Sequence, residues 1–151
     1  MTILATLTMM SLMAMPAAVQ RAGKGKLFAQ NVVEQAHRAH PEAAEIGISA
    51  RSARGCRTIA STDPSDIGES CEKDDAAPMQ TGKPFVGREG KSYDISLPLH
   101  DAKGRLVGSV GIELAPKPGQ TESAQVAQAK AIAGEMERRI LSKAALFQRS
   151  K

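Results

Sequence analysis

Apolar and polar positions divide the chain into an apolar leader, a helix, two groups of strands and a second helix. In residues 24–40, apolar side chains recur at spacings of three and four, which predicts a helix. Pro41 is expected to end it, because proline restricts the preceding residue and has no N–H to donate. Residues 45–51 and 56–61 are short strand-like segments separated by a turn, and predict a hairpin.

Three further strands are predicted at residues 85–89, 93–99 and 106–114, with turns between them. In the last two strands, large apolar residues alternate with small or polar ones. Since successive side chains of a strand point to opposite faces, one face of the sheet is expected to be apolar. The other face carries small and polar groups, which predicts a hollow above the sheet.

The chain after residue 119 predicts a long C-terminal helix, spanning residues 120–151. It begins near Thr121, and its apolar positions form a stripe from Val126 to Phe147. Such a helix is longer than one small sheet covers. Two interpretations stay open: it packs on its own sheet, or part of it forms a homodimer.

The first 20 residues contain no charged side chain, and residues 3–15 are strongly apolar. This pattern predicts a signal peptide or an N-terminal anchor over residues 1–22, with a buried helix as the third interpretation. The folded domain is then expected at residues 23–119, located in the periplasm or secreted. Whether the leader is cleaved, and whether the start is correctly placed, stay open.

Two cysteines, Cys56 and Cys71, gain significance from the expected export, because thiols pair in oxidising compartments. We predict a disulfide that closes a loop of 15 residues, which is worth roughly 3 kcal/mol in the chain-entropy model. Free thiols, or redox or metal chemistry, are the alternatives. A zinc site would need further thiols or histidines at a recognisable spacing.

The loop between these cysteines and the residues just after it are acidic. Residues 61–77 hold six aspartates and glutamates against one lysine, with Ile67 as their one large apolar side chain. Such a cluster suits either a solvated loop or a divalent cation site. Its spacing matches no calcium-binding loop, which favours the solvated loop and predicts no metal site.

Composition excludes several function classes. The chain has 151 residues, 3% aromatic residues and a formal net charge of +4, which indicates one modest domain and argues against nucleic-acid binding by base stacking. Motifs for a serine hydrolase, a zinc protease or a phosphate loop are missing from the sequence, so we expect no enzymatic activity. His37 and His40 have a spacing that suits a metal, but no third ligand is evident.

Two segments resemble a known family. GCRTIASTDPSDIGESC at residues 55–71 and TGKPFVGREGKSYDISLPLHDAKGRLVGSVGIEL at residues 81–114 resemble the single-domain form of Cache, or PDC, domains, which are PAS-like extracytoplasmic sensors. The shared positions are Pro98, Leu99, Asp101, Gly104 and Gly108. The resemblance implies an α+β fold with a PAS-like five-stranded antiparallel sheet, long N-terminal and C-terminal helices, and a small-molecule pocket beneath the loop between the second and third strands.

The function implied by this resemblance is a non-enzymatic sensor domain of signal transduction. It would bind a small polar metabolite, use no cofactor, and pass the event to a membrane signalling partner. The chain lacks the aromatic and Arg/Asp signature with which some relatives hold amino acids, so the ligand stays open. The alternative is a dimeric protein-interaction module that works through its C-terminal helix and has no ligand.

Strand alternation gives the candidate ligand-binding residues, which are Arg88, Tyr93, Asp94, Ser96 and Ser109. Arg88 is expected to clamp a carboxylate through paired donors, and Tyr93 to offer a ring and a hydroxyl. Other interpretations stay open: a solvated Arg88, a Tyr93 in the core, and an Asp94 paired with Arg88 or Lys91.

Overall fold

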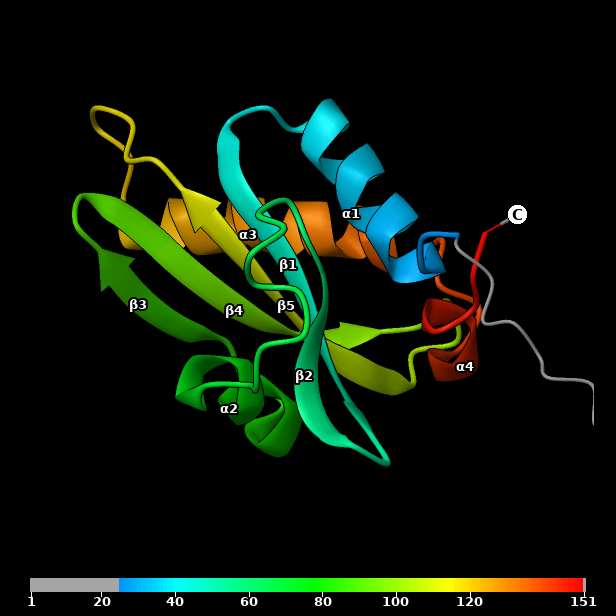
Figure 1. Ribbon diagram of the computed structural model, residues 1–151. Helices are drawn as coiled ribbons and strands as arrows, with labels where there is room; N and C mark the ends of the chain where they lie inside the picture. Colours follow the sequence, from blue (N-terminus) through cyan, green and yellow to red (C-terminus); the bar gives the residue numbers. More distant parts are fainter. Residues whose placement is uncertain (1–24, 151) are drawn as a thin grey trace, which may run out of the picture.

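The structure, a computed structural model, describes residues 25–150 and has an α+β fold (Figure 1). The expected leader at residues 1–22 lies outside the described residues. The elements, in chain order, are α1 Phe28–Ala39, β1 Ala43–Ser52, β2 Gly55–Ser61, α2 Lys73–Thr81, β3 Phe85–Glu89, β4 Ser92–His100, β5 Leu106–Leu114, α3 Glu122–Glu137 and α4 Lys143–Leu146. None of the helices in this part of the chain is long and apolar enough to cross a membrane.

The five strands form one antiparallel sheet in the order β2-β1-β5-β4-β3. This confirms the predicted fold class, and every predicted strand lies within two residues of its observed bounds. The last strand, β5, lies in the centre between β1 and β4. Residues far apart in the sequence therefore become neighbours across the middle of the sheet.

One face of the sheet packs against α1 and α3 and holds the hydrophobic core (Figure 1). Apolar residues of the three central strands alternate onto this face, as the sequence pattern predicts. The largest of them, all fully buried, are Ile46, Ile48, Ile95, Leu99, Ile112 and Leu114. Ala29, Val32, Val33 and Ala36 of α1 and Ala129, Ile132, Ala133 and Met136 of α3 complete the core.

The C-terminal helix is shorter than the sequence pattern predicts. α3 ends at Glu137, and the chain then turns so that Ile140 and Leu146 enter the core with no exposed surface. The last residues return beside the start of α1, where the Phe28 amide donates to the Gln148 carbonyl at 2.7 Å. Residues of the apolar stripe thus pack in the core of the same chain. A homodimer stays a prediction.

Two histidines tie α3 to the rest of the domain. His40, just after α1, lies 2.8 Å from the Glu135 carboxylate, and this hydrogen bond raises the pKa of His40. His100, at the end of β4, contacts Glu137 at 2.9 Å. His40 therefore has a structural partner in the fold.

The acidic segment forms a helix that the sequence analysis did not predict. Glu72 and Asp75 make a capping box at the start of α2, and Gly82 ends the helix in a left-handed conformation with φ 68°. α2 contacts β3, β4 and β5 on the face opposite α1 and α3 (Figure 1). The expected solvated loop is corrected accordingly: it is a short loop followed by a helix that covers part of the sheet.

Candidate functional site

A cavity of about 420 Å³ lies between the second face of the sheet, the acidic loop and the first turn of α2. Ten of its 17 lining residues are aspartate or glutamate. Among the residues that the structure describes, the lining includes no lysine, arginine or histidine. Its volume is that of a small-molecule site, for which about 300–1,000 Å³ is usual.

The floor of the cavity is built from cross-strand rows of the central strands. One row is Glu45 on β1, Glu113 on β5 and Asp94 on β4, which are direct register partners. The next row holds Gly47, Gly111 and Ser96. Antiparallel neighbours lie about 4.8 Å apart, so three carboxylates share one edge of the floor. Like charges in this register repel each other unless a proton or a cation lies between them.

The second row leaves the hollow open. A Cβ placed on Gly111 would meet no atom nearer than the Ser96 hydroxyl at 3.7 Å, and one on Gly47 would also meet nothing nearer than 3.7 Å. Ser96 is only 2% exposed and lines the cavity. Among the described residues, the buried hydroxyl that has no hydrogen-bond partner is that of Ser109, which lies in the sheet outside the cavity lining.

The loop wall is fixed to α1 through Ser61. Gln30 of α1 accepts from the Ser61 amide at 3.1 Å and donates to the Ser61 carbonyl at 2.9 Å. The Ser61 hydroxyl in turn donates to Asp66 at 3.2 Å and accepts from the Asp63 amide at 3.0 Å. These bonds hold Asp63 and Asp66 against Glu45, with one carboxylate oxygen of each within 4.8 Å of the others.

The opposite wall is the first turn of α2. Asp75 accepts from the Ser49 hydroxyl at 2.9 Å and from the Glu72 amide at 3.1 Å. Asp74 lies beside it and acts electrostatically on Asp94 of the floor.

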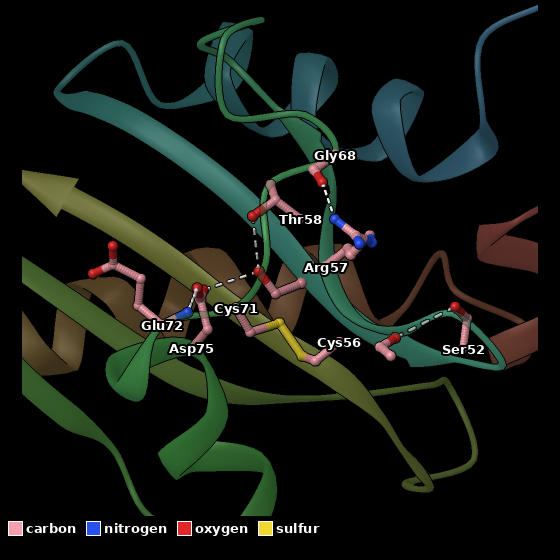
Figure 2. The surroundings of a disulfide bond; sticks show 10 residues. Ser52, Cys56, Arg57, Thr58, Gly68, Cys71, Glu72 and Asp75 are labelled. Atoms are coloured by element: carbon pink, nitrogen blue, oxygen red, sulfur yellow. Dashed lines mark hydrogen bonds between the residues drawn. A yellow bond between two sulfur atoms is a disulfide. The ribbon is translucent and has the colours of Figure 1, made fainter.

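A disulfide holds this wall in place (Figure 2). Cys56 on β2 bonds to Cys71, which directly precedes the α2 cap, across a Cα separation of 5.4 Å. The Cys71 amide donates to the Cys56 carbonyl at 3.2 Å, and the Arg57 guanidinium donates to the Gly68 carbonyl at 2.7 Å. The predicted disulfide is confirmed, and it ties the acidic loop to the edge of the sheet.

Two carboxyl groups of the cavity, those of Glu45 and Asp94, have raised pKa values. Burial, followed by the hydrogen bond and charge of Asp66, raises the pKa of Glu45 to about 7. Burial and the charge of Asp74 raise the pKa of Asp94 to about 6. These two groups therefore keep their protons to a higher pH than ordinary carboxyl groups do.

The predicted site residues are divided between the two faces. Asp94 and Ser96 line the cavity. Arg88 and Tyr93 lie on the face of α1 and α3, where the Arg88 guanidinium donates to the Tyr93 hydroxyl at 2.8 Å and stacks 3.9 Å above its ring. Tyr93 belongs to the core, as its other interpretation held. Ser109 is fully buried in the floor next to Ser49, outside the lining.

The sequence analysis missed most of the carboxylates of the site. On the floor these are Glu45 and Glu113, and on the walls Asp63, Asp66, Asp74 and Asp75. A signal for the floor is present in the sequence: Glu45-x-Gly47-x-Ser49 on one strand and Ser109-x-Gly111-x-Glu113 on another alternate in the same way. This signal identifies a site only once β1 and β5 are known to be antiparallel neighbours, because the two strands are far apart in the sequence.

Comparisons with known proteins bear on the fold. No protein-family model matches the chain, and no curated protein matches it in sequence. Among solved structures, a GAF sensor protein from Burkholderia vietnamiensis is similar at 14% identity with a TM-score of 0.52, over 78% of this chain and 76% of that one. A chain of the Escherichia coli DhaR(N)–DhaL complex is similar at 20% identity with a TM-score of 0.50, over 78% of this chain.

The chain spans only 48% of the length of that second chain. Identities this low establish a shared fold, here the five-stranded PAS-like architecture of GAF domains. A shared fold does not imply a shared ligand, so the chemistry of the acidic cavity follows only from the residues that line it in this chain.

Proposed function

We propose that this chain is an extracytoplasmic, non-enzymatic small-molecule-binding sensor domain, similar to single Cache domains, and that the acidic cavity is its ligand site. The observation that carries the proposal is the cavity itself, with its open glycine floor and the polar groups that line it. Ligand sites commonly combine such a concave space with a few convergent polar groups.

The contacts of the cavity supply a route from ligand to output. A ligand that contacts both Glu45 and Asp66 pulls the acidic loop toward the floor. The loop is bonded through Ser61 to Gln30 of α1. The start of α1 lies beside the last described residues, since the Ser150 amide donates to the Lys26 carbonyl at 2.9 Å. A shift of α1 would therefore reach both ends of the described chain, where we expect a membrane signalling partner to respond.

The disulfide and the apolar leader support the extracytoplasmic part of the proposal. A disulfide persists in oxidising compartments and is rare where thiols are kept reduced. Thiol trapping in intact cells tests this location: Cys56 and Cys71 should resist alkylation until a reductant is added. Free, alkylatable thiols in the cellular protein would contradict an extracytoplasmic location.

A thermal-shift screen of the purified chain tests ligand binding. The compounds should span amines, amino acids and organic acids. A ligand that binds the folded state and not the unfolded state raises the melting temperature, and the shift grows with ligand concentration relative to Kd. Gly111→Val tests whether the compound binds in the cavity. The valine side chain would occupy the hollow, and valine is favoured in strands. We expect a compound that raises the melting temperature of the natural chain and leaves that of Gly111→Val unchanged.

Gly134→Ala is the control, because a methyl group on this α3 glycine meets no atom within 4 Å. It should retain the full ligand-induced shift. Silence across all compound classes, or a shift that Gly111→Val retains, is the outcome that rejects the cavity as a ligand site.

A further inference from the structure

We propose that one end of the domain is a docking surface for an anionic phospholipid bilayer. This surface, called the basic end, consists of residues 25–27, the turn at residues 101–106 and residues 138–150. The inference is argued from the contacts that join these segments, from their charge and from their exposed leucines. It does not depend on a ligand in the acidic cavity.

Hydrogen bonds join the three segments of the basic end, although the segments are far apart in the sequence. The Ser150 amide donates to the Lys26 carbonyl at 2.9 Å, and the Ala102 amide donates to the Ile140 carbonyl at 2.8 Å. Figure 1 shows α4, the start of α1 and the end of the described chain on the same side of the molecule. The three segments therefore form one continuous surface.

The basic end carries a strong excess of positive charge. It contains seven lysines and arginines, all exposed, against one acidic side chain, that of Asp101. The seven are Lys26, Lys103, Arg105, Arg138, Arg139, Lys143 and Arg149. The rest of the described chain holds ten basic and fifteen acidic side chains. Charge is thus separated across the molecule, and an anionic surface attracts the basic end.

Few of these charges are neutralised within the protein. Arg105 pairs with Asp101 at 2.7 Å, and Lys26 pairs with Glu34 at 2.6 Å. The other five cations form no ion pair within residues 25–150, and residues 1–24 contain no aspartate or glutamate. Clusters of roughly four to eight lysines and arginines are typical of segments that bind anionic lipids. The number of free cations on the basic end falls in this range.

Exposed leucines favour a bilayer over other anionic partners. Three large apolar side chains are exposed among the described residues, and two of them, Leu106 and Leu141, belong to the basic end. Leu141 is 71% exposed, and its carbonyl accepts from Arg105 at 3.4 Å, which joins it to the segment of Leu106. Apolar side chains beside cations insert at the boundary between lipid headgroups and acyl chains. They add nothing to phosphate contacts on a nucleic acid.

Strand direction and the predicted leader agree with docking at this end. β5 begins at Leu106 and reaches the cavity floor at Glu113, seven positions and roughly 23 Å further along. Docking at the basic end therefore keeps the carboxylate row of the floor away from anionic lipid. The apolar positions of the leader, residues 3–15, end ten positions before Gly25. As an anchor, the leader would hold the basic end within about 30 Å of a bilayer.

A tryptophan reporter in the purified full chain tests docking, because the natural sequence contains no tryptophan. Leu141→Trp places the reporter on the basic end, with Leu106→Trp as a second reporter there. Ile67→Trp, at a position 44% exposed on the acidic loop, is the matched control. The probes are phosphatidylcholine vesicles with and without phosphatidylglycerol. We expect a blue shift of the emission for both basic-end reporters with the anionic vesicles alone, and none for Ile67→Trp. A leader that binds vesicles by itself shifts none of them.

Charge variants in the Leu141→Trp background measure the electrostatic part. Arg139→Gln with Lys143→Gln removes two cations of the basic end, whereas Lys91→Gln with Lys117→Gln removes two exposed cations at the opposite end of the sheet. The lipid concentration that gives half of the shift should rise about tenfold for the first pair and stay unchanged for the second. The shift should also weaken between about 0.1 M and about 1 M salt, because the Debye length shortens from about 10 Å to about 3 Å.

The opposite results reject the docking surface. Unchanged emission of both basic-end reporters with anionic vesicles overturns it, as do equal shifts with neutral vesicles. Equal weakening by the two charge pairs shows that total charge, rather than the basic end, drives binding, and overturns it as well. A DNA duplex or polyglutamate that shifts the emission where vesicles do not assigns this surface to a nucleic acid or an acidic protein instead. None of these results bears on ligand binding in the cavity, so the two proposals fail separately.

Discussion

The two faces of the central sheet are built from the same strands and have opposite chemistry. Toward α1 and α3 the strands present fully buried isoleucines, leucines and valines. Toward α2 they present carboxylates, serines and glycines around an open cavity. Consecutive residues switch between the two: Ile112 is in the core and Glu113 is on the cavity floor.

The difference teaches how stability and function are divided in this small domain. Burying an isoleucine is worth a few kcal/mol, so the helix face supplies most of the stability. The cavity face brings like charges together and leaves a hollow, both of which cost stability. The proposed ligand site accounts for the residues on this face, and changes on the two faces should have different effects on stability.

The largest expected effect is on the helix face. Ile112→Ala removes a side chain with no exposed surface from the centre of the core and should lower the free energy of unfolding by about 4 kcal/mol. Glu113→Gln, one residue away, removes one of several repelling charges and should leave that free energy unchanged or raise it slightly. Urea denaturation of both variants measures the difference.

A matched loss for both variants would contradict the division between the faces. The circular dichroism spectrum of each variant is the control for folding, and the urea midpoint should fall only for Ile112→Ala. A constant slope of the urea transition confirms that stability has changed, rather than the extent of unfolding.

The fold was largely predictable, because each element depends on local patterns. The strands at residues 85–89 and 106–114 are predicted with their observed bounds, since alternation and flanking turns mark both ends. The long C-terminal helix was overestimated. Its stripe of apolar residues continues past Glu137, but Ile140 and Leu146 reach the core through a turn, which periodicity alone does not reveal.

The disulfide gives the next largest effect. None of residues 62–84 belongs to the hydrophobic core cluster, so the Cys56–Cys71 bond takes on this wall the role that packing has on the other face. Replacing both cysteines by serine should cost about 3 kcal/mol, as expected for a loop of 15 residues. Thermal unfolding of the natural chain under oxidising conditions, compared with that of the double serine variant, measures this cost. The natural chain after reduction provides a second comparison.

If the bond is purely structural, the reduced natural chain and the double serine variant should unfold at similar temperatures. A natural chain that keeps its melting temperature after complete reduction would show that the wall is held by other contacts. Amide exchange of residues 62–72 should speed up in the double variant, while exchange in β5 stays slow.

The candidate site was less predictable than the fold, because it depends on contacts between distant segments. Asp94 and Ser96 were found from alternation within one strand. Glu45 and Glu113 become neighbours only through the pairing of β1 with β5. Arg88 was expected in the pocket because its charge suits a carboxylate, but its register partner is the core residue Tyr93, which fixes its face.

Two glycines of β5, Gly108 and Gly111, test the difference between the two faces of the sheet. A Cβ on Gly108 would lie 2.4 Å from the Ser49 carbonyl oxygen, whereas one on Gly111 would enter the hollow. Gly108→Ala should therefore cost about 2 kcal/mol through overpacking. Gly111→Ala should be neutral or gain about 0.5 kcal/mol, because alanine restricts the unfolded chain more than glycine does. Equal destabilisation by both changes, measured in urea, would contradict an open floor.

The smallest expected effect is the pH dependence of stability, which reports on the crowded carboxylates. The pKa of Glu45 rises from its ordinary value of 4.5 to about 7, and the pKa of Asp94 rises from 3.8 to about 6. Above the ordinary values, the folded state binds more protons than the unfolded state. Stability therefore falls as the pH rises through this window.

Between about pH 5 and about pH 8 the loss should be on the order of 1–2 kcal/mol, allowing for solvent screening of these partly exposed groups. It lowers the melting temperature by roughly 3–5 °C. The raised pKa of His40 acts in the same direction, since its charged form bonds Glu135. The lowered pKa values of Glu34, Glu42, Asp63 and Asp101 act mainly below this range.

Variants assign the pH dependence to its sources. Glu45→Gln combined with Asp94→Asn should flatten most of the slope of melting temperature against pH, whereas His40→Gln should remove only a small part of it. The two carboxylates face Asp63, Asp66 and Glu113, or Asp74, Asp75 and Glu89, and no base among the described lining residues compensates them. A double variant that retains the natural slope would show that these carboxylates titrate normally, and that the cavity face costs the protein no electrostatic stability.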